Sequence, residues 1–241
     1  MDLKDQLAMV TGASGGIGHA IALALAKIGT RLALVGRDYS RLEMLAAKAA
    51  ELGAAVRFYQ VDLANAEEIR RLAKGVLTDF GQVDILVHSV GIFSMAAVEI
   101  ADLMDLESQY VINVRSPYLL TQALLPSLKT QKGQIVFVNS TAGLQSRANM
   151  AQYGATKHAL RAIADSLREE VNPQGVRVLS IFLGRTATPM QADACKIEGR
   201  DYHPELLIQP EDVAAMIISA LCLPPTAEVT EIRMRPLLKS Y

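Results

Sequence analysis

The sequence predicts an α/β fold in which helices cover both faces of a doubly wound, parallel β-sheet. Seven apolar runs of strand length recur along the 241 residues, at 7–10, 31–36, 55–60, 83–87, 135–139, 176–182 and 229–234. Stretches with a helical period separate them, at 16–29, 38–52, 65–79, 102–130, 151–172 and 210–222. This alternation is typical of a parallel sheet, since each parallel pair of strands needs a long connection. Right-handed crossovers predict the strand order 3-2-1-4-5-6-7, with the first and fourth strands adjacent at the switch point where ligands bind.

The composition indicates one domain, residues 1–241, that associates with further copies of itself. A chain of 26.0 kDa can bury one large core, and no internal segment has the composition of a linker. The hydrophobic fraction of 51% and the mean hydropathy of +0.22 are high for a monomer with a fully hydrated surface. We therefore expect a homodimer or homotetramer, in which a neighbouring subunit covers apolar helix surface.

The charge distribution argues against nucleic acid and membrane partners. The formal net charge is −1, from 24 basic and 25 acidic residues, and no basic run could follow a phosphate backbone. Charged residues such as Arg31 and Arg37 interrupt the apolar stretches well before membrane-spanning length, and residues 1–5 lack the features of a signal peptide. A cytoplasmic protein is expected. Neither the two cysteines, Cys195 and Cys222, nor the four scattered histidines have metal-ligand spacing, so no metal site is expected.

A glycine-rich turn joins the first predicted strand to the first predicted helix. It reads Thr11-Gly12-Ala13-Ser14-Gly15-Gly16-Ile17-Gly18. Glycines there let a pyrophosphate approach the first N–H groups of the helix, where any Cβ would collide, so a dinucleotide is the natural ligand. The spacing of Gly12, Gly16 and Gly18 differs from G-x-G-x-x-G, and an ordinary glycine-rich turn is the alternative.

Three polar residues lie where a parallel sheet places its ligands. Ser140 comes shortly after the apolar run 135–138, at the carboxyl end of a predicted strand. Tyr153 and Lys157 are four residues apart in the predicted helix 151–172 and therefore share a face. For the tyrosine and the lysine, an exposed helix pair is the alternative.

With these segments in place, the chain resembles the short-chain dehydrogenase/reductase family over nearly its whole length. The matching elements are T-G-x-x-x-G-x-G at Thr11–Gly18, the acid after the third strand at Asp62, the asparagine at Asn113, the serine at Ser140, Y-x-x-x-K at Tyr153–Lys157 and P-G-x-x-x-T at Leu183–Thr188. The resemblance implies a single Rossmann-like domain that transfers a hydride between NAD(P) and a carbonyl or alcohol substrate. It departs from the family pattern at two points. His88-Ser89-Val90-Gly91 replaces the usual N-N-A-G, which implies looser support of the sheet, and Leu183 replaces a proline, which implies altered loop rigidity.

The resemblance also implies the roles of four catalytic residues, Asn113, Ser140, Tyr153 and Lys157. Tyr153 gives the proton in reduction and takes it in oxidation, while Ser140 orients and polarises the carbonyl oxygen. A free tyrosine titrates at about 10, so the positive charge of Lys157 is expected to lower that pKa. Lys157 should also bind the nicotinamide ribose. Asn113 is expected to hold a water that links Lys157 to solvent, and a buried amide satisfied by the backbone is its alternative.

Residues at the end of the second strand favour NADP(H) over NAD(H). An NAD-selective fold places an acid there, whereas this chain has Gly36 followed by Arg37, whose guanidinium can fork onto a 2′-phosphate. Ser14 could add a hydroxyl donor to the same phosphate. In the alternative, Arg37 is a solvated residue at a helix start that pairs with Asp38 or Glu43.

The expected cofactor contacts extend around the nucleotide. Asp62 would accept a hydrogen bond from the adenine beside the Leu63 backbone, or cap the helix that begins near Asn65. The remaining contacts come from the glycine turn, the segment after the fourth strand and the loop after the sixth: Gly12, Gly16, Ile17, Gly18, Ser89, Val90, Gly91, Gly184, Thr186 and Thr188, together with Tyr153 and Lys157.

The substrate is expected to bind beneath residues 184–210, which break the alternation and are predicted to form a loop that closes over it, or a surface excursion without function. Apolar residues are the candidates for the pocket, namely Phe93, Leu144, Met150 and Met190, and they suit a medium-sized ketone, aldehyde or secondary alcohol. Arg147 or Arg185 could instead clamp a carboxylate, as in a hydroxy-acid dehydrogenase. A non-catalytic nucleotide-sensing protein is a further alternative, which the complete set of four catalytic residues argues against.

Overall fold

The computed structural model describes residues 2–238 and confirms the predicted fold class. Residues 1 and 239–241 of the predicted domain 1–241 lie outside this range. Within it, parallel pairing joins the strands in the order β3-β2-β1-β4-β5-β6-β7, as predicted. The strands are β1 (Leu7–Thr11), β2 (Arg31–Gly36), β3 (Val56–Gln60), β4 (Ile85–His88), β5 (Gln134–Ser140), β6 (Arg177–Leu183) and β7 (Glu231–Met234).

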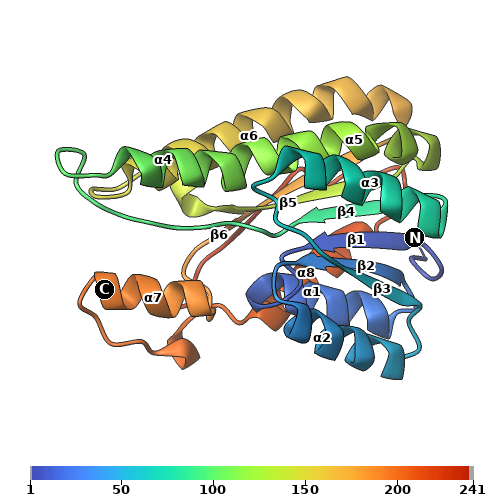
Figure 1. Ribbon diagram of the computed structural model, residues 1–241, viewed down its shortest axis with the longest axis horizontal. Helices are drawn as coiled ribbons and strands as arrows, with labels where there is room; N and C mark the ends of the chain where they lie inside the picture. Colours follow the sequence, from blue (N-terminus) through green and yellow to red (C-terminus); the bar gives the residue numbers. More distant parts are fainter. Residues whose placement is uncertain (1, 239–241) are drawn as a thin grey trace.

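Helices form a layer on each side of the sheet (Figure 1). One layer consists of α1 (Gly16–Lys27), α2 (Tyr39–Glu51) and α8 (Pro210–Leu221), and the other of α3 (Ala66–Phe80), α5 (Ser116–Gln131) and α6 (Ala151–Val171). Two shorter helices lie towards the carboxyl ends of the strands, α4 (Leu103–Tyr110) and α7 (Pro189–Ile197).

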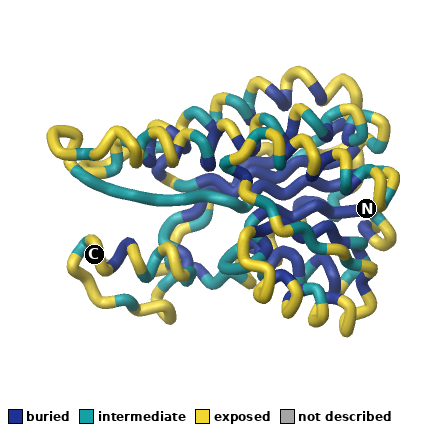
Figure 2. The backbone as a smooth tube through the Cα atoms, in the orientation of Figure 1, coloured by how far each residue is buried: buried dark blue, intermediate teal, exposed yellow. Residues whose placement is uncertain are grey.

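Alternate side chains of β1 belong to two separate hydrophobic cores. Ala8 and Val10 pack with residues of α1, α2 and α8, whereas Leu7 and Met9 pack with residues of α3, α5 and α6. All four are fully buried, and Figure 2 shows the central strands of the sheet in dark blue. Because both faces are covered, the central strands read as continuous apolar runs, which is why the sequence marked them clearly.

The predicted single helix over 102–130 is wrong in one detail. A π-helical stretch, Val111–Arg115, separates α4 from α5. Pro117 follows in the first turn of α5 and has no N–H to donate to the carbonyl of Asn113, and its ring would collide with that carbonyl in a regular α-helix. The wider π turn removes this collision, since its hydrogen bonds reach one residue further along the chain.

The segment 184–210 is more regular than predicted. It contains α7 and a 3₁₀ turn, Pro204–Leu206. The Thr188 side chain caps α7 by accepting from the Gln191 N–H, and Pro189 occupies the first helical position. Thr-Pro is therefore a helix start here and not an interruption, because a threonine cap and a proline at the first position both suit a helix N-terminus.

None of the helices within residues 2–238 combines the length and the apolar character that crossing a bilayer requires.

Candidate active site

The glycine turn forms a cradle at the carboxyl end of β1 in which three distant segments meet. Gly12 has a φ of +69°, and a Cβ there would lie 3.0 Å from the carbonyl oxygen of Ser89. Gly16 has a φ of +55°, and its Cβ would lie 3.2 Å from the Thr188 methyl carbon. A Cβ on Gly18 would collide with the backbone oxygen of Gly12. The turn thus keeps open the space that a pyrophosphate needs before the first N–H groups of α1.

Ser14 and two arginines surround the end of β2. A Cβ on Gly36 would lie 2.9 Å from the Ser14 hydroxyl, so a side chain at position 36 would displace Ser14. Arg37 is exposed and forms no ion pair with any residue in the described range 2–238. Asp38 instead caps α2 at the Arg41 N–H and pairs with the Arg41 guanidinium at 3.2 Å, so the suggested pairing of Arg37 with Asp38 or Glu43 is wrong.

Arg41 is a site residue that the sequence analysis missed. Its Nη1 lies 3.9 Å from the position that a Cβ of Gly15 would take, which places the guanidinium beside the glycine turn. The sequence contained a sign of this placement. In Asp38-x-x-Arg41 an aspartate at a helix start is followed three residues later by an arginine, a spacing at which the two side chains can form an ion pair.

Asp62 is exposed beyond β3, and its carboxylate accepts a hydrogen bond from the Ala64 N–H at 2.9 Å. The cap of α3 is Asn65, whose Oδ1 accepts from the N–H groups of Glu67 and Glu68. The alternative that Asp62 caps this helix is therefore wrong. The adjacent Leu63 is buried, and its carbonyl accepts from the Ser116 hydroxyl.

His88 braces the sheet where the family pattern has asparagine. Its ring is buried, stacks on Phe137 of β5 at 4.9 Å between centroids, and its Nε2 lies 2.7 Å from the hydroxyl of Thr121 on α5. Burial lowers the pKa of His88 to about 3. Ser89 follows, and its N–H donates to the hydroxyl of Thr11 at 3.1 Å. His88 thus ties β4 to β5 and α5 by contacts of its own.

Ser140, Tyr153 and Lys157 come together at the carboxyl end of β5. Tyr153 and Lys157 lie on the same side of α6 and are 9% and 4% exposed, so they are not an exposed helix pair. The Lys157 Nζ lies 5.6 Å from the centre of the Tyr153 ring. The Ser140 Oγ is fixed by accepting from the Ala142 N–H at 3.1 Å, and its hydroxyl hydrogen-bonds the phenol.

Burial dominates the titration of this group of residues. It raises the pKa of Tyr153 to about 12, and hydrogen bonding with Ser140 lowers that pKa only in part. Burial lowers the pKa of Lys157 to about 8. The predicted lowering of the Tyr153 pKa is thus wrong for the structure, since loss of hydration outweighs the favourable interactions of the phenolate.

The Asn113 amide ties the π turn to the segment after β4. Its Oδ1 accepts from the Ile92 N–H at 2.9 Å, and its Nδ2 donates to the Ile92 carbonyl at 3.0 Å and to the Thr156 hydroxyl at 3.1 Å. The alternative of a buried amide satisfied largely by backbone describes this side chain. Pro117 leaves the backbone carbonyl of Asn113 without its regular helical donor, so this carbonyl can accept a hydrogen bond from a water.

The predicted pocket residues lie at different depths. Phe93 packs edge-to-face on Tyr153, with ring centres 5.0 Å apart and an interplanar angle of 83°. Leu144 and Met150 are half-buried in the loop after β5, whereas Met190 on α7 is exposed. Arg147 is exposed as well.

Arg185 has a partner within the loop that follows β6. Its Nη2 donates to both carboxylate oxygens of Glu198, at 2.8 and 2.6 Å. A carboxylate clamp formed by Arg185 is therefore already occupied by this glutamate.

Gln109 is a second residue that the sequence analysis missed. It is 1% exposed on α4, its Oε1 accepts from the Ser94 N–H at 3.3 Å, and its Nε2 donates to the Ser94 hydroxyl at 2.8 Å. The signal was its position four residues before Asn113, since two amides at that spacing face the same segment.

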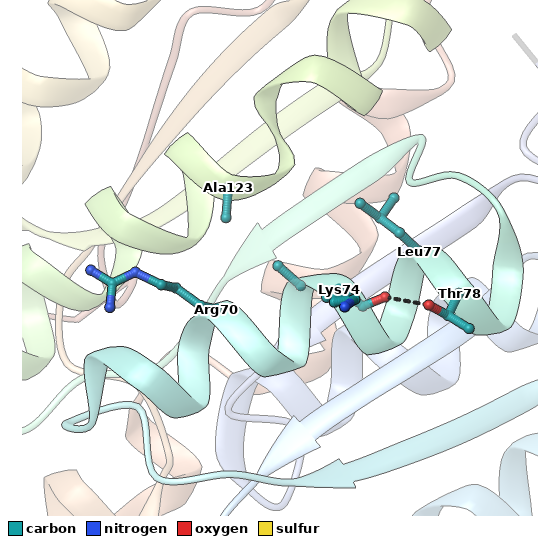
Figure 3. Close-up of a pocket in the computed structure, with 6 residues that line it drawn as sticks. Arg70, Lys74, Leu77, Thr78 and Ala123 are labelled. Atoms are coloured by element: carbon teal, nitrogen blue, oxygen red, sulfur yellow. Dashed lines mark hydrogen bonds between the residues drawn. The ribbon is translucent and has the colours of Figure 1, made fainter.

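A groove of about 410 Å³ lies on the outer surface between α3 and α5 (Figure 3). Six residues line it, Arg70, Ala73, Lys74, Leu77, Thr78 and Ala123, and none of them is a predicted site residue. Within residues 2–238, no three histidine, cysteine, aspartate or glutamate side chains cluster as metal ligands would.

The comparisons with known proteins agree with the fold and the site. The short chain dehydrogenase family profile matches residues 6–198. An uncharacterised oxidoreductase of Staphylococcus saprophyticus is 34% identical over 238 residues, which cover 98% of this chain and 99% of the relative. These matches define an oxidoreductase, and the chain belongs to the short-chain dehydrogenase/reductase family.

Solved structures of the family superpose over nearly the whole chain. The alcohol dehydrogenase from the archaeon Thermococcus sibiricus, complexed with 5-hydroxy-NADP, has a TM-score of 0.90 and 28% identity, covering 99% of each chain. An NAD+-bound xylitol dehydrogenase has a TM-score of 0.88 and 25% identity, covering 98% of this chain and 100% of the other.

Proposed function

We propose that this oxidoreductase interconverts a ketone or aldehyde and the corresponding alcohol, using NADP(H). One observation carries the proposal. A buried phenol and a buried ammonium group, from Tyr153 and Lys157, meet the half-buried Ser140 hydroxyl at the end of the sheet that also carries a glycine cradle fit for a dinucleotide. A non-catalytic nucleotide sensor would have no use for this combination.

The residues divide the proton chemistry among them, while the nicotinamide, when bound, supplies or accepts the hydride. The Ser140 hydroxyl orients the substrate oxygen and stabilises the negative charge that develops on it. Tyr153 keeps its proton at neutral pH, because burial raises its pKa to about 12. It can therefore protonate an alkoxide, which is a much stronger base than a phenolate. In oxidation the same oxygen must accept a proton, which favours the phenolate at higher pH.

Lys157 and Asn113 support this step. We assign the Lys157 Nζ to the nicotinamide ribose hydroxyls. It lies 5.6 Å from the centre of the Tyr153 ring, where a positive charge favours the phenolate form of Tyr153. We assign Asn113 to the water that connects Lys157 with solvent, through its backbone carbonyl. Its amide meanwhile holds Ile92 and Thr156 in place.

The preference for NADP(H) rests on the residues at the end of β2. Arg37 is free of ion pairs among the described residues, Arg41 lies beside the glycine turn, and Ser14 of that turn lies against Gly36. The one nearby acid, Asp38, is held by α2 and Arg41, so it does not oppose a 2′-phosphate. The Thermococcus sibiricus enzyme is likewise described with an NADP derivative, whereas the xylitol dehydrogenase holds NAD+.

Further cofactor contacts are proposed at the remaining positions of the crevice. They are Gly12, Gly16, Ile17 and Gly18 in the turn, Asp62 and Leu63 after β3, Ser89, Val90 and Gly91 after β4, and Gly184, Thr186 and Thr188 after β6. Thr188 supports this assignment. Its methyl group lies against Gly16 of the glycine turn, so the loop after β6 reaches the residues after β1.

The substrate we propose is a medium-sized apolar carbonyl or alcohol. Phe93 contacts the Tyr153 ring, Leu144 and Met150 are half-buried apolar residues of the loop after β5, and Arg185 is engaged with Glu198. A hydroxy-acid substrate would therefore depend on Arg147 alone. We further propose that the active form is a homodimer or homotetramer, and a cytoplasmic location stays a prediction from the sequence.

The substitution Tyr153→Phe tests the catalytic assignment. We expect turnover of a panel of carbonyl compounds, followed by NADPH absorbance, to fall by about 10²–10⁴-fold, because the proton donor is lost. NADPH binding should persist, and its fluorescence reports binding on little background since the chain has no tryptophan. Tyr118→Phe, at an exposed tyrosine on α5, is the matched control. Retained turnover in Tyr153→Phe would remove this residue from the mechanism.

A further inference from the structure

The segment that follows β4 forms a wall of the active site without belonging to any helix or strand. Residues 89–96 are half-buried throughout, and Figure 2 shows them as a teal tube that runs from the sheet towards α4. Phe93 lies in the middle of this segment and contacts the Tyr153 ring edge-to-face. An extended segment of this kind has no ladder of its own to fix it, so neighbouring groups must do so.

Two buried amides hold the residues on either side of Phe93. Asn113 binds both backbone groups of Ile92, at 2.9 and 3.0 Å. Gln109 binds the backbone N–H of Ser94 at 3.3 Å and its hydroxyl at 2.8 Å. Both amides are 1% exposed, so a broken bond would leave a buried polar group without a partner. Phe93 is thereby held in place on both sides.

Tyr153 needs such external support because of its place in α6. It is the third residue of the helix, and the preceding Met150 provides no side-chain cap. The first turn of a helix lacks four of its intrahelical hydrogen bonds and is its least restrained part. The Phe93 ring lies directly against the phenol ring in this turn.

We propose that Gln109 is a positioning residue, which acts through Ser94 and Phe93 to hold the Tyr153 ring in its reactive orientation. Asn113 shares this task, but it also binds Thr156, so its loss would disturb α6 directly. Both polar groups of the Gln109 side chain bind Ser94, which makes Gln109 the cleaner probe. The catalytic part of this inference rests on the proposed function.

The first test is a double-mutant cycle with Gln109→Met, which keeps the length of the side chain and removes both hydrogen bonds, and Phe93→Leu. We expect Gln109→Met to lower kcat about tenfold, because a misplaced catalytic group costs rate, with KM and the NADPH dissociation constant changed less than about twofold. In the Phe93→Leu background the same change should cost less than about twofold, since the two residues act in series. Additive effects would overturn the proposal.

A second readout needs no turnover. With ¹³C-labelled tyrosine, the Tyr153 signal is assigned by its loss in Tyr153→Phe, and its ring environment is reported by its chemical shift. Gln109→Met should move this signal towards its position in Phe93→Leu, and Gln109→Glu, which keeps the acceptor for the Ser94 N–H, should restore it in part. Gln122→Met, at an exposed glutamine on α5, is the matched control and should leave it unmoved.

The outcomes separate this inference from the proposed function. An unmoved Tyr153 signal in folded Gln109→Met overturns the positioning role, whatever the activity. If Gln109→Met does not fold, Ser94→Ala replaces it, because this change removes only the hydrogen bond to the Ser94 hydroxyl. Ser94→Ala must then move the Tyr153 signal in the same direction by a smaller amount. A wild-type protein that reduces no carbonyl would overturn the proposed function, while a moved signal would still support the coupling of Gln109 to Tyr153 through Ser94 and Phe93.

Discussion

Arg37 and Arg41 follow the carboxyl end of β2, where we propose that the 2′-phosphate of NADP(H) binds, and they give the cofactor preference a direct test. Arg37→Asp should raise the NADPH dissociation constant by more than about 30-fold, since the lost charge-assisted bond of about 2 kcal/mol alone accounts for about 30-fold and a repulsion is added. The NADH constant should change far less. Fluorescence titration measures both.

The controls separate a local contact from the change in net charge. Arg71→Asp, at an exposed arginine on α3, changes the net charge equally and should leave both constants unaltered. Arg41→Ala should weaken NADPH binding in the same direction as Arg37→Asp. Equal losses for NADPH and NADH in Arg37→Asp would contradict the proposed 2′-phosphate contact.

Single residues show where sequence reasoning reaches its limit. Residue spacing was enough to predict that Tyr153 and Lys157 share a face and that Ser140 ends a strand, because helix period and strand polarity are local properties. The pKa of Tyr153 could not be predicted in this way. Its value depends on burial by residues such as Phe93, which reach the tyrosine only through the fold. The partner of Arg185, Glu198, was missed for the same reason.

His88 predicts how the stability of the protein depends on pH. Its folded pKa is about 3, against an ordinary value of 6.5, because it is buried. Between these values the unfolded chain binds a proton that the folded protein does not, so the free energy of unfolding falls as the pH drops below about 6.5, by up to about 1.4 kcal/mol per pH unit.

Urea unfolding between about pH 7.5 and about pH 5 measures this dependence, since most carboxylates titrate below this range. His88→Asn should flatten the pH profile relative to the wild type, whatever its absolute stability. His203→Asn, at an exposed histidine, is the control and should retain the wild-type slope. A His88→Asn profile parallel to that of the wild type would contradict the assignment of the slope to this ring.

At the scale of elements, the strands and most helices were predictable because their signals are local. The π turn and α7 were not, although both have local causes. To predict the collision at Pro117, one must already know that the chain is helical on both sides of this proline. Thr188-Pro189 looks like an interruption until the residues after it are known to be helical, when the same pair becomes a cap and a first residue.

The close approach of Gly18 in α1 to the glycine turn can be tested by replacing glycine with alanine at two positions, one inside this contact and one away from it. Gly18→Ala should destabilise the protein by about 1–3 kcal/mol, because the new Cβ meets the Gly12 backbone oxygen and the turn must shift. Gly75→Ala, inside α3 with the nearest atom 4.0 Å from the new Cβ, should stabilise it by about 0.5–1 kcal/mol through helix propensity.

Urea unfolding of both variants gives the comparison, and NADPH titration of Gly18→Ala shows whether the displaced turn still binds. The opposite signs are the decisive result. A Gly18→Ala protein as stable as Gly75→Ala would show that the turn yields to the methyl group without cost.

At the scale of the whole molecule, strand order converts distant sequence positions into one site. β1 lies between β2 and β4, and β4 lies beside β5. The glycine turn and Ser89 follow β1 and β4, and Gly36 and Ser140 end β2 and β5, so all of them lie at the carboxyl end of the sheet. Right-handed crossovers make this order predictable from the alternation of elements. Which apolar side chains stay exposed cannot be predicted from the strand order, since their exposure depends on how helices of different lengths cover the sheet.

Exposed apolar side chains provide the physical basis for the proposed association between subunits. Val98, Ile100, Leu103 and Met104 are 77%, 78%, 63% and 66% exposed within one short stretch before and at the start of α4. Large exposed apolar surface is uncommon on a soluble monomer and is typical of surfaces that a partner covers. We therefore expect light scattering to give a mass of two or four times the 26.0 kDa of one chain.

The unfolding temperature provides an independent check on the association. Because dissociation accompanies unfolding of an oligomer, the midpoint should rise with protein concentration, whereas that of a monomer does not depend on it. A mass of one chain at every concentration, together with a constant midpoint, would contradict the oligomer. The apolar stretch at α4 would then face solvent in the free protein, and its exposure would not be explained by a second subunit.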